Sequence, residues 1–386
     1  MKILVVNPGS QSKKYALYVN KRQVFLAHFE NTPKGYILTT NLNGSVEEKK
    51  IKPRQFQSAF TQTIDYLKKQ IIINQISDLR CIAVRVVCPG LYFSEHRIID
   101  KTYLQKLNKS LSQAPLHIAA TLEEVRFLIK KSKDAPIYAI SDSAFHTTLP
   151  EEAKYYAINK KDSDALELYR YGYHGLSIQS IIRQIKDTGY LPEKIIVAHL
   201  GGGASITAVK NGKSIDTSMG FTPLEGLVMA TRVGDIDAGA LFYLGQKKSF
   251  TYKKFNRYLN EESGLLGVSQ ISSDIRVLLE KEAEGNKDVA LALNLYAYKI
   301  KKTIGSYITV LNGLDLLVFT GTVGLRSDPM RNKIIHQLNH LHLELDKSKN
   351  KSVPENGYIH QENSVPILVA KTDEMGIIAQ EATKLL

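Results

Sequence analysis

Four polar side chains could do chemistry together: three lie in or beside apolar segments, where an ionisable group is unfavourable unless it is paired or has a function, and the fourth lies in an irregular segment. They are Arg85, Asp142, His174 and Arg232. Two guanidinium groups, a carboxylate and an imidazole that met in one cleft would position a transferring phosphoryl group and neutralise its charge. Each of them, the histidine above all, could instead be a paired structural residue, because spacing along the chain does not show that side chains converge.

Two glycine-bearing turns follow apolar, strand-like runs, an arrangement that can expose backbone N–H groups to a phosphate. The first is Asn7-Pro8-Gly9-Ser10, with Lys14 shortly after it, and the second is His199-Leu200-Gly201-Gly202-Gly203. Neither matches the P-loop pattern GxxxxGK[ST]. A plain hairpin turn for the first and a tight turn with positive φ for the second are the alternative interpretations.

Residues 216–237 are the most unusual stretch, because they fit neither a helical nor a strand period. They are rich in Gly, Thr and Asp. An irregular segment of this length inside a domain is typical of a functional loop. Arg232 lies within it, and the planar fork of a guanidinium group matches the oxygens of a phosphoryl group.

The elements that must position these residues fall into two series with the same order. The first series, up to about residue 145, predicts strands first and then alternating helices and strands, as in a mixed sheet covered by helices. A strand, a glycine turn and a strand start again at residue 195, which hints at a duplicated domain. The predicted strands are 3–6, 15–19, 23–29, 35–40, 81–87, 137–140, 195–200, 204–209, 314–320 and 365–369, the predicted helices are 53–69, 115–130, 288–312 and 374–385, and 347–351 is predicted to be a charged surface loop.

The composition excludes several classes of protein. Of 386 residues, 43% are apolar and 23% charged, which is ordinary for a globular chain of two or three domains. The net charge of +13 attracts anions, but the lysines are scattered and no pattern for reading nucleic acid is present, so we expect neither a nucleic-acid nor a membrane partner. No apolar run is long enough for a membrane helix or a signal peptide, and Cys81 and Cys88 would point to opposite faces of a strand, which argues against a mutual disulfide and favours the cytoplasm.

Taken together and in this order, the segments resemble the acetate kinase family of short-chain carboxylate kinases. The resemblance runs from Asn7 to Glu374, almost the whole chain. Its most specific part is Asp216-Thr217-Ser218-Met219-Gly220-Phe221-Thr222-Pro223-Leu224-Glu225-Gly226-Leu227, followed by the arginine loop 231–237. Supporting segments are Ala114-Pro115-Leu116-His117, Ser143-Ala144-Phe145-His146, Tyr171-Gly172-Tyr173-His174-Gly175, residues 262–267 and 272–276, and Thr372-Asp373-Glu374.

The resemblance implies an α/β fold with two related domains of the sugar kinase, Hsp70 and actin type and a nucleotide cleft between them. Residues 1–146, with the C-terminal helix 376–386, would form the N-terminal domain, and residues 147–375 the nucleotide-binding and dimerisation domain. The activity would be the reversible phosphorylation of acetate by ATP, with Mg²⁺ or Mn²⁺, through direct in-line transfer that gives acetyl phosphate and ADP. The protein would be a cytoplasmic homodimer.

The resemblance also assigns roles to individual residues. Asp142, His174 and Arg232 would be catalytic, and Asn7 and Glu374 would bind the metal. Because acetate is already ionised at neutral pH, the Asp142 carboxylate has no proton to remove from it, and we expect it to position the metal or its water ligands. The substrate would contact Arg85, Val87, Leu116, Tyr173 and Pro223. The nucleotide would contact Lys14, His199, Leu200, Gly201, Gly202, Gly203, Asp274, Ile275, Arg276, Thr322, Val323, Gly324, Leu325 and Arg326.

Departures from the family pattern leave alternatives open. Tyr173 replaces a phenylalanine of the acyl pocket, and a pocket distinguishes one methylene group by only about 1–3 kcal/mol, so propionate or another short-chain carboxylate is an alternative substrate. Both nucleotide loops differ from the family, with Gly202 in place of an asparagine and Arg326 as a new cation that could reach a phosphate. Pyrophosphate as donor, or a non-catalytic nucleotide-binding homologue, therefore also stays open. The retained charged residues favour an active but divergent kinase.

Overall fold

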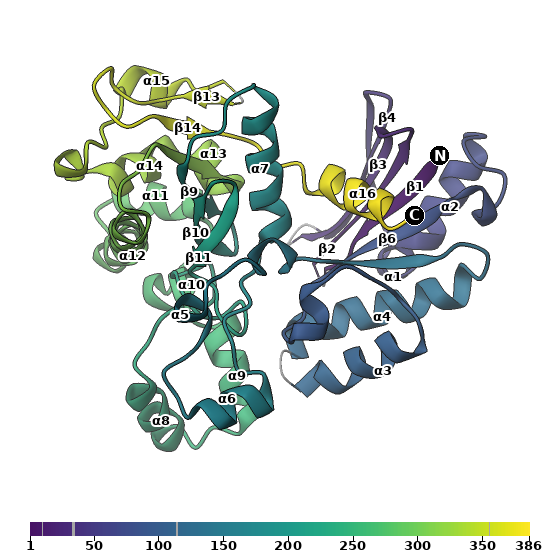
Figure 1. The fold of residues 1–386 in the computed structure, drawn as a ribbon, viewed down its shortest axis with the longest axis horizontal. Helices are drawn as coiled ribbons and strands as arrows, with labels where there is room; N and C mark the ends of the chain where they lie inside the picture. Colours follow the sequence, from purple (N-terminus) through teal and green to yellow (C-terminus); the bar gives the residue numbers. More distant parts are fainter. Residues whose placement is uncertain (10, 33–34, 113–114, 355) are drawn as a thin grey trace. The chain divides into compact units, whose positions relative to one another are not determined.

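The computed structural model describes residues 1–386 apart from 10, 33–34, 113–114 and 355, and apart from the side chains of 112 and 115–117. The chain folds into two compact units. Unit 1 comprises Met1–Ala144 and Asp373–Leu386, and unit 2 comprises Phe145–Thr372 (Figure 1). The predicted domain boundary at residue 146 and the functions assigned to the two domains stay predictions.

Unit 1 is built on a mixed sheet with the strand order β5-β4-β3-β2-β1-β6-β8-β7. The first five strands form an antiparallel meander, which then continues as the parallel set β1, β6 and β8. β1 and β6 are apolar on both faces, as expected for strands covered on both sides. The strands are β1 (Lys2–Asn7), β2 (Ser12–Val19), β3 (Arg22–Thr32), β4 (Gly35–Leu42), β5 (Ser45–Ile51), β6 (Cys81–Val86), β7 (Arg97–Ile98) and β8 (Ile137–Ser141).

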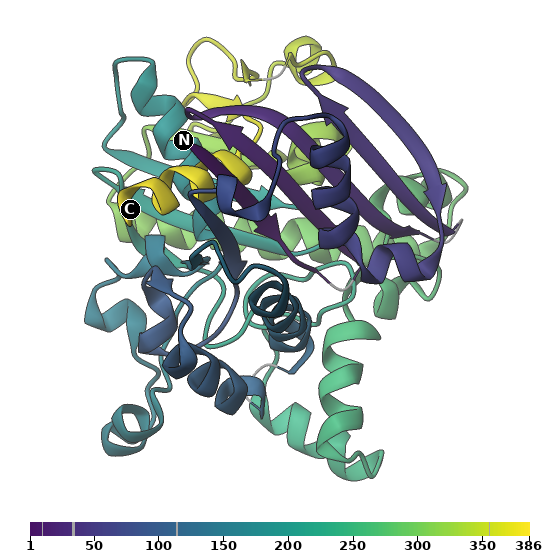
Figure 2. The same cartoon turned by 90° about the vertical axis from the view of Figure 1, so that its right-hand side faces the viewer.

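Helices close the core of unit 1, and one of them comes from the C-terminal end of the chain. This helix, α16, packs against β1, β6 and β8 (Figures 1 and 2). The aromatic rings of Tyr15, Phe25, Phe29 and Phe60 fill the core beside β2 and β3. The helices are α1 (Pro53–Gln57), α2 (Ala59–Lys69), α3 (Lys101–Lys109), α4 (Pro115–Lys131) and α16 (Glu374–Lys384), with 3₁₀ turns at Ile76–Asp78, Leu91–Ser94 and Ser110–Ser112.

Unit 2 contains a second mixed sheet, with the order β11-β10-β9-β12-β14-β13. β9, β12 and β14 are parallel, and β10 and β11 form a hairpin. The turn of that hairpin is the predicted Asn211-Gly212, and both residues have positive φ (50° and 76°), as a type I′ turn requires. The strands are β9 (Lys194–Leu200), β10 (Ala204–Lys210), β11 (Lys213–Thr217), β12 (Leu316–Thr320), β13 (Gly357–Tyr358) and β14 (Ile367–Val369).

The long helix α12 is the main support of the second sheet, and it packs on β9 and β10 and on the helices α10, α11 and α14. It is capped by Asn286, whose side chain accepts a hydrogen bond from the Val289 N–H. The helices are α5 (Glu151–Lys154), α6 (Lys160–Leu166), α7 (Gly175–Asp187), α8 (Ala238–Lys247), α9 (Tyr252–Glu261), α10 (Gly264–Ser269), α11 (Ile275–Ala283), α12 (Lys287–Leu311), α13 (Gly321–Arg326), α14 (Asp328–Ile335) and α15 (Lys347–Lys351), with 3₁₀ turns at Ala144–His146 and Asn339–Leu341. No helix in the described part of the chain is long and apolar enough to cross a membrane.

Three of the predicted elements have another form in the structure. The predicted helix 53–69 is two helices, because Ser58 leaves the helical conformation and its hydroxyl donates to the Arg54 carbonyl. The predicted surface loop 347–351 is the short helix α15, started by the Asp346 carboxylate, which accepts from two backbone N–H groups. The predicted nucleotide loop 321–326 is the helix α13, because only Gly321 has a special conformation (φ 76°). A side chain at Gly321 would collide with the Leu200 backbone, so only glycine fits there.

Candidate active site

Unit 1 brings together four of the predicted residues, here called the acidic cluster: Asn7, Arg85, Asp142 and Glu374. Asn7 ends β1, Arg85 lies near the end of β6 and Asp142 directly follows β8. Because these three strands are parallel, their carboxyl ends meet at one edge of the sheet. Glu374 is the first residue of α16, the helix that packs against the same strands.

Arg85 is the centre of the acidic cluster. Its Nε and Nη2 donate to the two Asp142 oxygens at 3.0 Å each, a bidentate pair. Its Nη1 lies 3.4 Å from Glu374 Oε2 and 3.5 Å from Asn7 Oδ1, and Asn7 Nδ2 is 3.4 Å from the same glutamate oxygen. Burial alone would lower the pKa of Arg85, but Asp142 and Glu374 outweigh it and raise that pKa. One cation faces two carboxylates, so the cluster keeps an excess of negative charge.

Unit 2 brings together a second set, here called the cationic cluster: His174, His199, Gly203 and Arg232. His174 precedes α7 in the left-handed conformation (φ 59°), and its Nδ1 lies 2.9 Å from Ser205 Oγ on β10. Its ring packs on that of His199, with 4.6 Å between centroids. A side chain at Gly203 would meet His174 Nε2 at 3.3 Å and Arg232 Nη1 at 3.5 Å, so the imidazole and the guanidinium converge on this glycine.

Arg232 differs from Arg85 in having no anionic partner. Its Nη1 donates to the Pro223 carbonyl at 3.2 Å and lies 3.5 Å from Met229 Sδ, and no carboxylate in the described part of the chain pairs with it. Burial lowers its pKa, and no neighbouring charge opposes that effect. A desolvated guanidinium without a counter-ion is a strong attractor for an anion, and a phosphoryl group fits its donors.

The irregular segment that carries Arg232 is held in place by the polar side chains of Arg170 and Glu225. Arg170 Nη2 donates to Glu225 Oε1 at 2.6 Å, and its Nη1 donates to the Thr217 carbonyl at 3.1 Å. The Tyr156 hydroxyl donates to the other Glu225 oxygen. The segment is also closed on itself, since Gly226 and Asp235 exchange two hydrogen bonds. This segment is therefore a fixed loop rather than a loose one, which suits a residue that must meet a phosphoryl group.

The predicted nucleotide segments of unit 2 start at one edge of its sheet. His199 at the end of β9 pairs in register with Thr320 at the end of β12, so the triple glycine and α13 begin side by side. The would-be Cβ of Gly201 lies 3.9 Å from the Thr322 nitrogen. Leu200 is fully buried, whereas Gly202 and Thr322 are exposed. Val323, Gly324 and Leu325 are inner residues of α13 and are buried or half-buried. Arg326, the new cation, is exposed at the last turn of α13.

The other predicted nucleotide ligands lie on separate elements. Asp274 caps α11 and binds the Arg276 side chain of the same turn at 2.6 Å, while Ile275 between them is buried. Lys14 lies on β2 directly opposite Asn7, so the two side chains share one face of the unit 1 sheet. The exposed pair Asp274–Arg276 and the lysine therefore stay predicted nucleotide contacts.

The predicted acyl pocket residues are divided between the units. Val87 follows β6 and is half-buried, and the Leu116 side chain lies outside the described residues. Pro223 is buried and its carbonyl contacts Arg232. Tyr173 is 1% exposed, and its hydroxyl donates to the Phe221 carbonyl at 2.6 Å. The extra hydroxyl of Tyr173 is thus satisfied by the backbone instead of being presented to a substrate.

Two supporting residues were missed by the sequence analysis. Ser205 follows the second glycine turn by two residues and was not singled out, although it orients the His174 ring. Arg331 is 2% exposed and donates to the Gly324 and Leu325 carbonyls at 2.8 and 3.0 Å, so it fixes the end of α13 from inside the unit. The sequence feature that could have identified Arg331 is its position between the apolar residues Met330 and Ile334, on the buried face of a helix.

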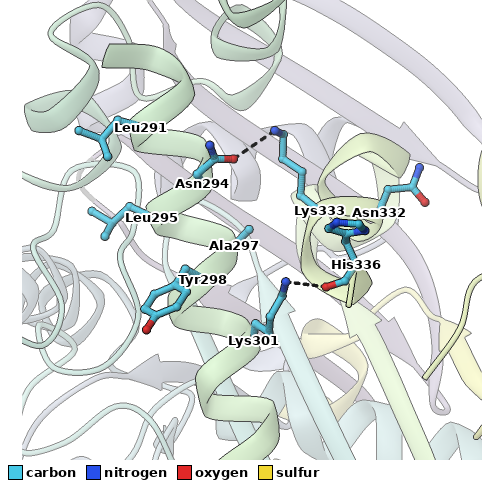
Figure 3. A pocket seen from close by; sticks show the side chains of 9 residues that line it. All are labelled: Leu291, Asn294, Leu295, Ala297, Tyr298, Lys301, Asn332, Lys333 and His336. Atoms are coloured by element: carbon cyan, nitrogen blue, oxygen red, sulfur yellow. Dashed lines mark hydrogen bonds between the residues drawn. The ribbon is translucent and has the colours of Figure 1, made fainter. Parts of the chain in front are cut away.

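A groove of about 660 Å³ on the outside of unit 2 contains none of the predicted site residues (Figure 3). It lies between α12 and α14. Lys333, on its wall, pairs with Glu282 at 2.7 Å and contacts Asn294, and Lys301 donates to the His336 carbonyl. The cations of this groove are therefore used within the unit, and the groove adds nothing to the site.

Comparisons with known proteins agree with this arrangement. The model of the Acetokinase family matches residues 2–380. Acetate kinases of Dictyoglomus thermophilum and Thermoanaerobacterium thermosaccharolyticum are each 38% identical to the chain, covering 100% of it and 99% of their own length. Among solved structures, a propionate kinase of Francisella tularensis superposes with a TM-score of 0.89 at 35% identity, covering 98% of both chains. An acetate kinase of Porphyromonas gingivalis superposes with a TM-score of 0.85 at 32% identity, covering 100% of this chain and 99% of its own.

These comparisons confirm the fold class and the family that the sequence motifs predicted. The two-sheet α/β architecture is that of the acetate and propionate kinases it superposes on. The matches extend over the full length of the relatives, so no part of the resemblance depends on a single motif. The chain belongs to the acetokinase family.

Proposed function

We propose that the protein catalyses the reversible transfer of the γ-phosphoryl group of ATP to acetate, giving acetyl phosphate and ADP. Membership of the acetokinase family and full-length relatives named acetate kinase support this activity. The observation that carries it furthest is the half-buried Arg232 guanidinium, which has no carboxylate partner in the described part of the chain and converges with His174 on Gly203. Together they supply the donors that the equatorial oxygens of a transferring phosphoryl group need.

The acidic cluster fits a divalent metal. Asn7 Oδ1 and the Glu374 and Asp142 carboxylates are hard oxygen ligands of the kind that Mg²⁺ and Mn²⁺ take, and the cluster keeps a negative excess. We propose Asn7 and Glu374 as its ligands, with Asp142 held by Arg85 close to the metal or its water molecules. The metal, when bound, would neutralise charge on the phosphates. The prediction that the acidic and cationic clusters face each other across a cleft belongs to this proposal.

Arg85 is the proposed ligand of the substrate carboxylate, and its hydrogen bonds favour one atom, Nη1, for this role. Its Nε and Nη2 are occupied by Asp142, whereas its Nη1 makes only the longer contacts of 3.4 and 3.5 Å. Nη1 is therefore the donor available to a carboxylate. Val87, Leu116, Tyr173 and Pro223 are the proposed contacts of the methyl group.

A second candidate function is the phosphorylation of propionate. It is favoured by the likeness to the Francisella tularensis protein, whose name is propionate kinase and whose TM-score of 0.89 exceeds that of the Porphyromonas gingivalis acetate kinase. One added methylene changes binding by only about 1–3 kcal/mol, so the two acids should differ by at most about 200-fold in kcat/KM.

One matrix of assays tests both candidates. Acetate, propionate and butyrate are each combined with ATP or pyrophosphate and Mg²⁺, and the acyl phosphate is trapped with hydroxylamine. Formation of hydroxamate from acetate and ATP supports the proposal, and a larger kcat/KM with propionate selects the second candidate. If no pair gives hydroxamate while nucleotide still binds, the protein is a non-catalytic nucleotide-binding homologue.

We also propose that the protein acts as a homodimer in the cytoplasm. Helix α8 has no buried residue, and Phe242 and Tyr243 on it are 79% and 63% exposed, an unusual amount of bare aromatic surface. Both cysteines are buried free thiols, as expected in a reducing compartment. Light scattering of Phe242→Asp against the matched control Tyr190→Asp tests the interface, since Tyr190 is equally exposed on another surface (72%). Dissociation by the control alone would refute the assignment of α8.

A further inference from the structure

His96 is a histidine of unit 1 that the proposed reaction does not use, and it lies between the two elements that carry the catalytic carboxylates. It directly precedes β7, and its side chain is 16% exposed. The Ser141 N–H donates to its Nδ1 at 3.0 Å. Its Nε2 lies 3.6 Å from Glu381 Oε2 on α16. The ring therefore bridges the end of β8, which leads into Asp142, and the helix that begins with Glu374.

Helix α16 packs on the sheet through buried apolar residues, and it also carries two carboxylates that contact residues beside the strands. Glu374 and Glu381 are seven residues apart, which is two helical turns, or about 10 Å along the axis. The first lies beside Arg85 and the second beside His96, while Glu381 also accepts from Lys384 at 2.7 Å. Glu381 is 6% exposed, so its charge is largely removed from water and its partners matter.

Two hydrogen bonds help to hold the turn after β8. Ser141 Oγ accepts from the Ser143 N–H at 3.1 Å, and the Asp142 N–H donates to the Val86 carbonyl at 3.0 Å. Ser141 itself is 2% exposed, and its own N–H is directed at His96. A buried backbone donor that loses its acceptor costs about 1–3 kcal/mol, and the chain next to Asp142 would move to recover that loss.

We propose that His96 is a positioning residue of the phosphoryl-transfer site: its neutral ring accepts from Ser141 and docks Glu381, and so sets the distance between Asp142 and Glu374. This inference rests on the proposed function. The role requires an unprotonated Nδ1, because a protonated imidazole has two N–H donors and no acceptor. Acidification therefore releases the Ser141 N–H while it strengthens the contact with Glu381.

The surroundings of the ring favour its neutral form. Burial lowers the pKa of His96 from its usual value of 6.5, Glu381 opposes this effect, and Lys384 adds to it. A cavity of about 460 Å³ reaches the ring, so protons can exchange with solvent. The titratable and charged groups that face the ring or line this cavity are Glu381 and Lys384 of α16, Tyr138 of β8, Arg97 beside it with its partner Glu95, Tyr92, and Asp100 before α3.

The test is the pH dependence of kcat in the full-length protein and four variants. His96→Asn keeps an acceptor at the δ position and does not titrate, His96→Gln reaches only Glu381, and His96→Leu does neither. His360→Asn is the matched control, since burial also lowers the pKa of His360 but it lies in unit 2. We expect kcat of the wild type and the control to fall as the pH drops through the lowered pKa of His96, and His96→Asn to lose that fall. His96→Leu should have a kcat about 10-fold lower at every pH, with KM for ATP unchanged.

A second readout does not depend on activity. The Ser141 amide resonance, followed by NMR, should titrate with the His96 ring in the wild type and stay constant in His96→Asn. Because the folded pKa is lowered, the stability contributed by neutral His96 is present above about pH 6.5 and is lost as the pH falls through the folded pKa. The inference would be overturned if the Ser141 amide resonance did not titrate with the His96 ring. It would also be overturned if kcat of His96→Asn still fell at acidic pH. A wild type without kinase activity but with the titrating amide would refute only the proposed function.

Discussion

The two clusters use half-buried arginines in opposite ways. In the acidic cluster, Arg85 is held by a bidentate aspartate and a glutamate, and its pKa is raised. In the cationic cluster, the half-buried Arg232 contacts a carbonyl and a thioether, and its pKa is lowered. The first guanidinium is paired within the unit and leaves only Nη1 for a further carboxylate, whereas the second has no carboxylate partner in the described part of the chain. An unpaired charge is unfavourable in the folded protein and becomes favourable when a phosphoryl group arrives. Under the proposed function, Arg232 would therefore stabilise the transition state, whereas Arg85 would order the acidic cluster and bind the substrate carboxylate.

The largest expected effect comes from removing the unpaired cation. Arg232→Met should lower kcat by at least about 10³-fold, the range found for arginines that stabilise phosphoryl transfer. Its melting temperature should stay equal to that of the wild type or rise, because methionine fills similar space without a buried charge. Arg183→Met on α7 is the control, since Arg183 is 49% exposed and pairs with Asp187. If Arg232→Met loses activity because it unfolds, Arg232 also supports the fold, and the proposed difference between Arg232 and Arg85 is wrong.

The next largest effect is expected when the ion pair between Arg85 and Asp142 is broken. Asp142→Ala should lower kcat by about 10²-fold and, unlike Arg232→Met, should destabilise unit 1 by about 3 kcal/mol, because Arg85 loses its bidentate partner. The double variant Arg85→Met, Asp142→Leu should regain much of that stability without regaining activity. Urea unfolding and the hydroxamate assay measure the two quantities. Equal stability of the single and double variants would show that the pair is not coupled.

The sequence predicted the members of both clusters but not this difference between them. Arg85 and Asp142 stand at the ends of parallel strands, and that position was readable from apolar runs followed by polar residues. That Asp142 pairs with Arg85 and not with another cation depends on the register of β6 and β8, which only the folded sheet fixes. The loop 216–237 was recognised as irregular, but the partners that fix it, such as Arg170, come from outside it.

Secondary-structure predictions from local sequence patterns were wrong where a single residue or a neighbouring strand determines the backbone conformation. Gly321 confines the special conformation to one position, so the expected loop is the helix α13. Asp346 starts a helix in a stretch whose lysines indicated only a charged surface. The strand β5 was missed because nearly all of its residues are exposed and polar, and it exists through pairing with β4. In each case a cap or a neighbouring strand overrides the composition of the segment.

A smaller effect on stability is expected when inorganic phosphate binds to Arg232. Inorganic phosphate at about 100 times its dissociation constant should stabilise the wild type by about 2.7 kcal/mol. Arg232→Met should lose most of this stabilisation, whereas Asp142→Ala should keep it, because the acidic cluster repels phosphate in the absence of metal. Thermal unfolding with and without phosphate, at constant ionic strength, measures the effect. If phosphate stabilises Arg232→Met as much as the wild type, the anion site lies elsewhere.

The smallest effect concerns the acyl pocket. Tyr173→Phe removes one hydrogen bond, from the hydroxyl to the Phe221 carbonyl, and should cost about 1 kcal/mol of stability. The ratio of kcat/KM for acetate to that for propionate should change by less than about 2-fold, because the hydroxyl is directed at the backbone rather than at the substrate. A larger shift toward propionate would mean that the hydroxyl does reach the acyl group. The choice between the two acids would then depend on a residue that already departs from the family pattern, and the acyl pocket would have to be redrawn around Tyr173.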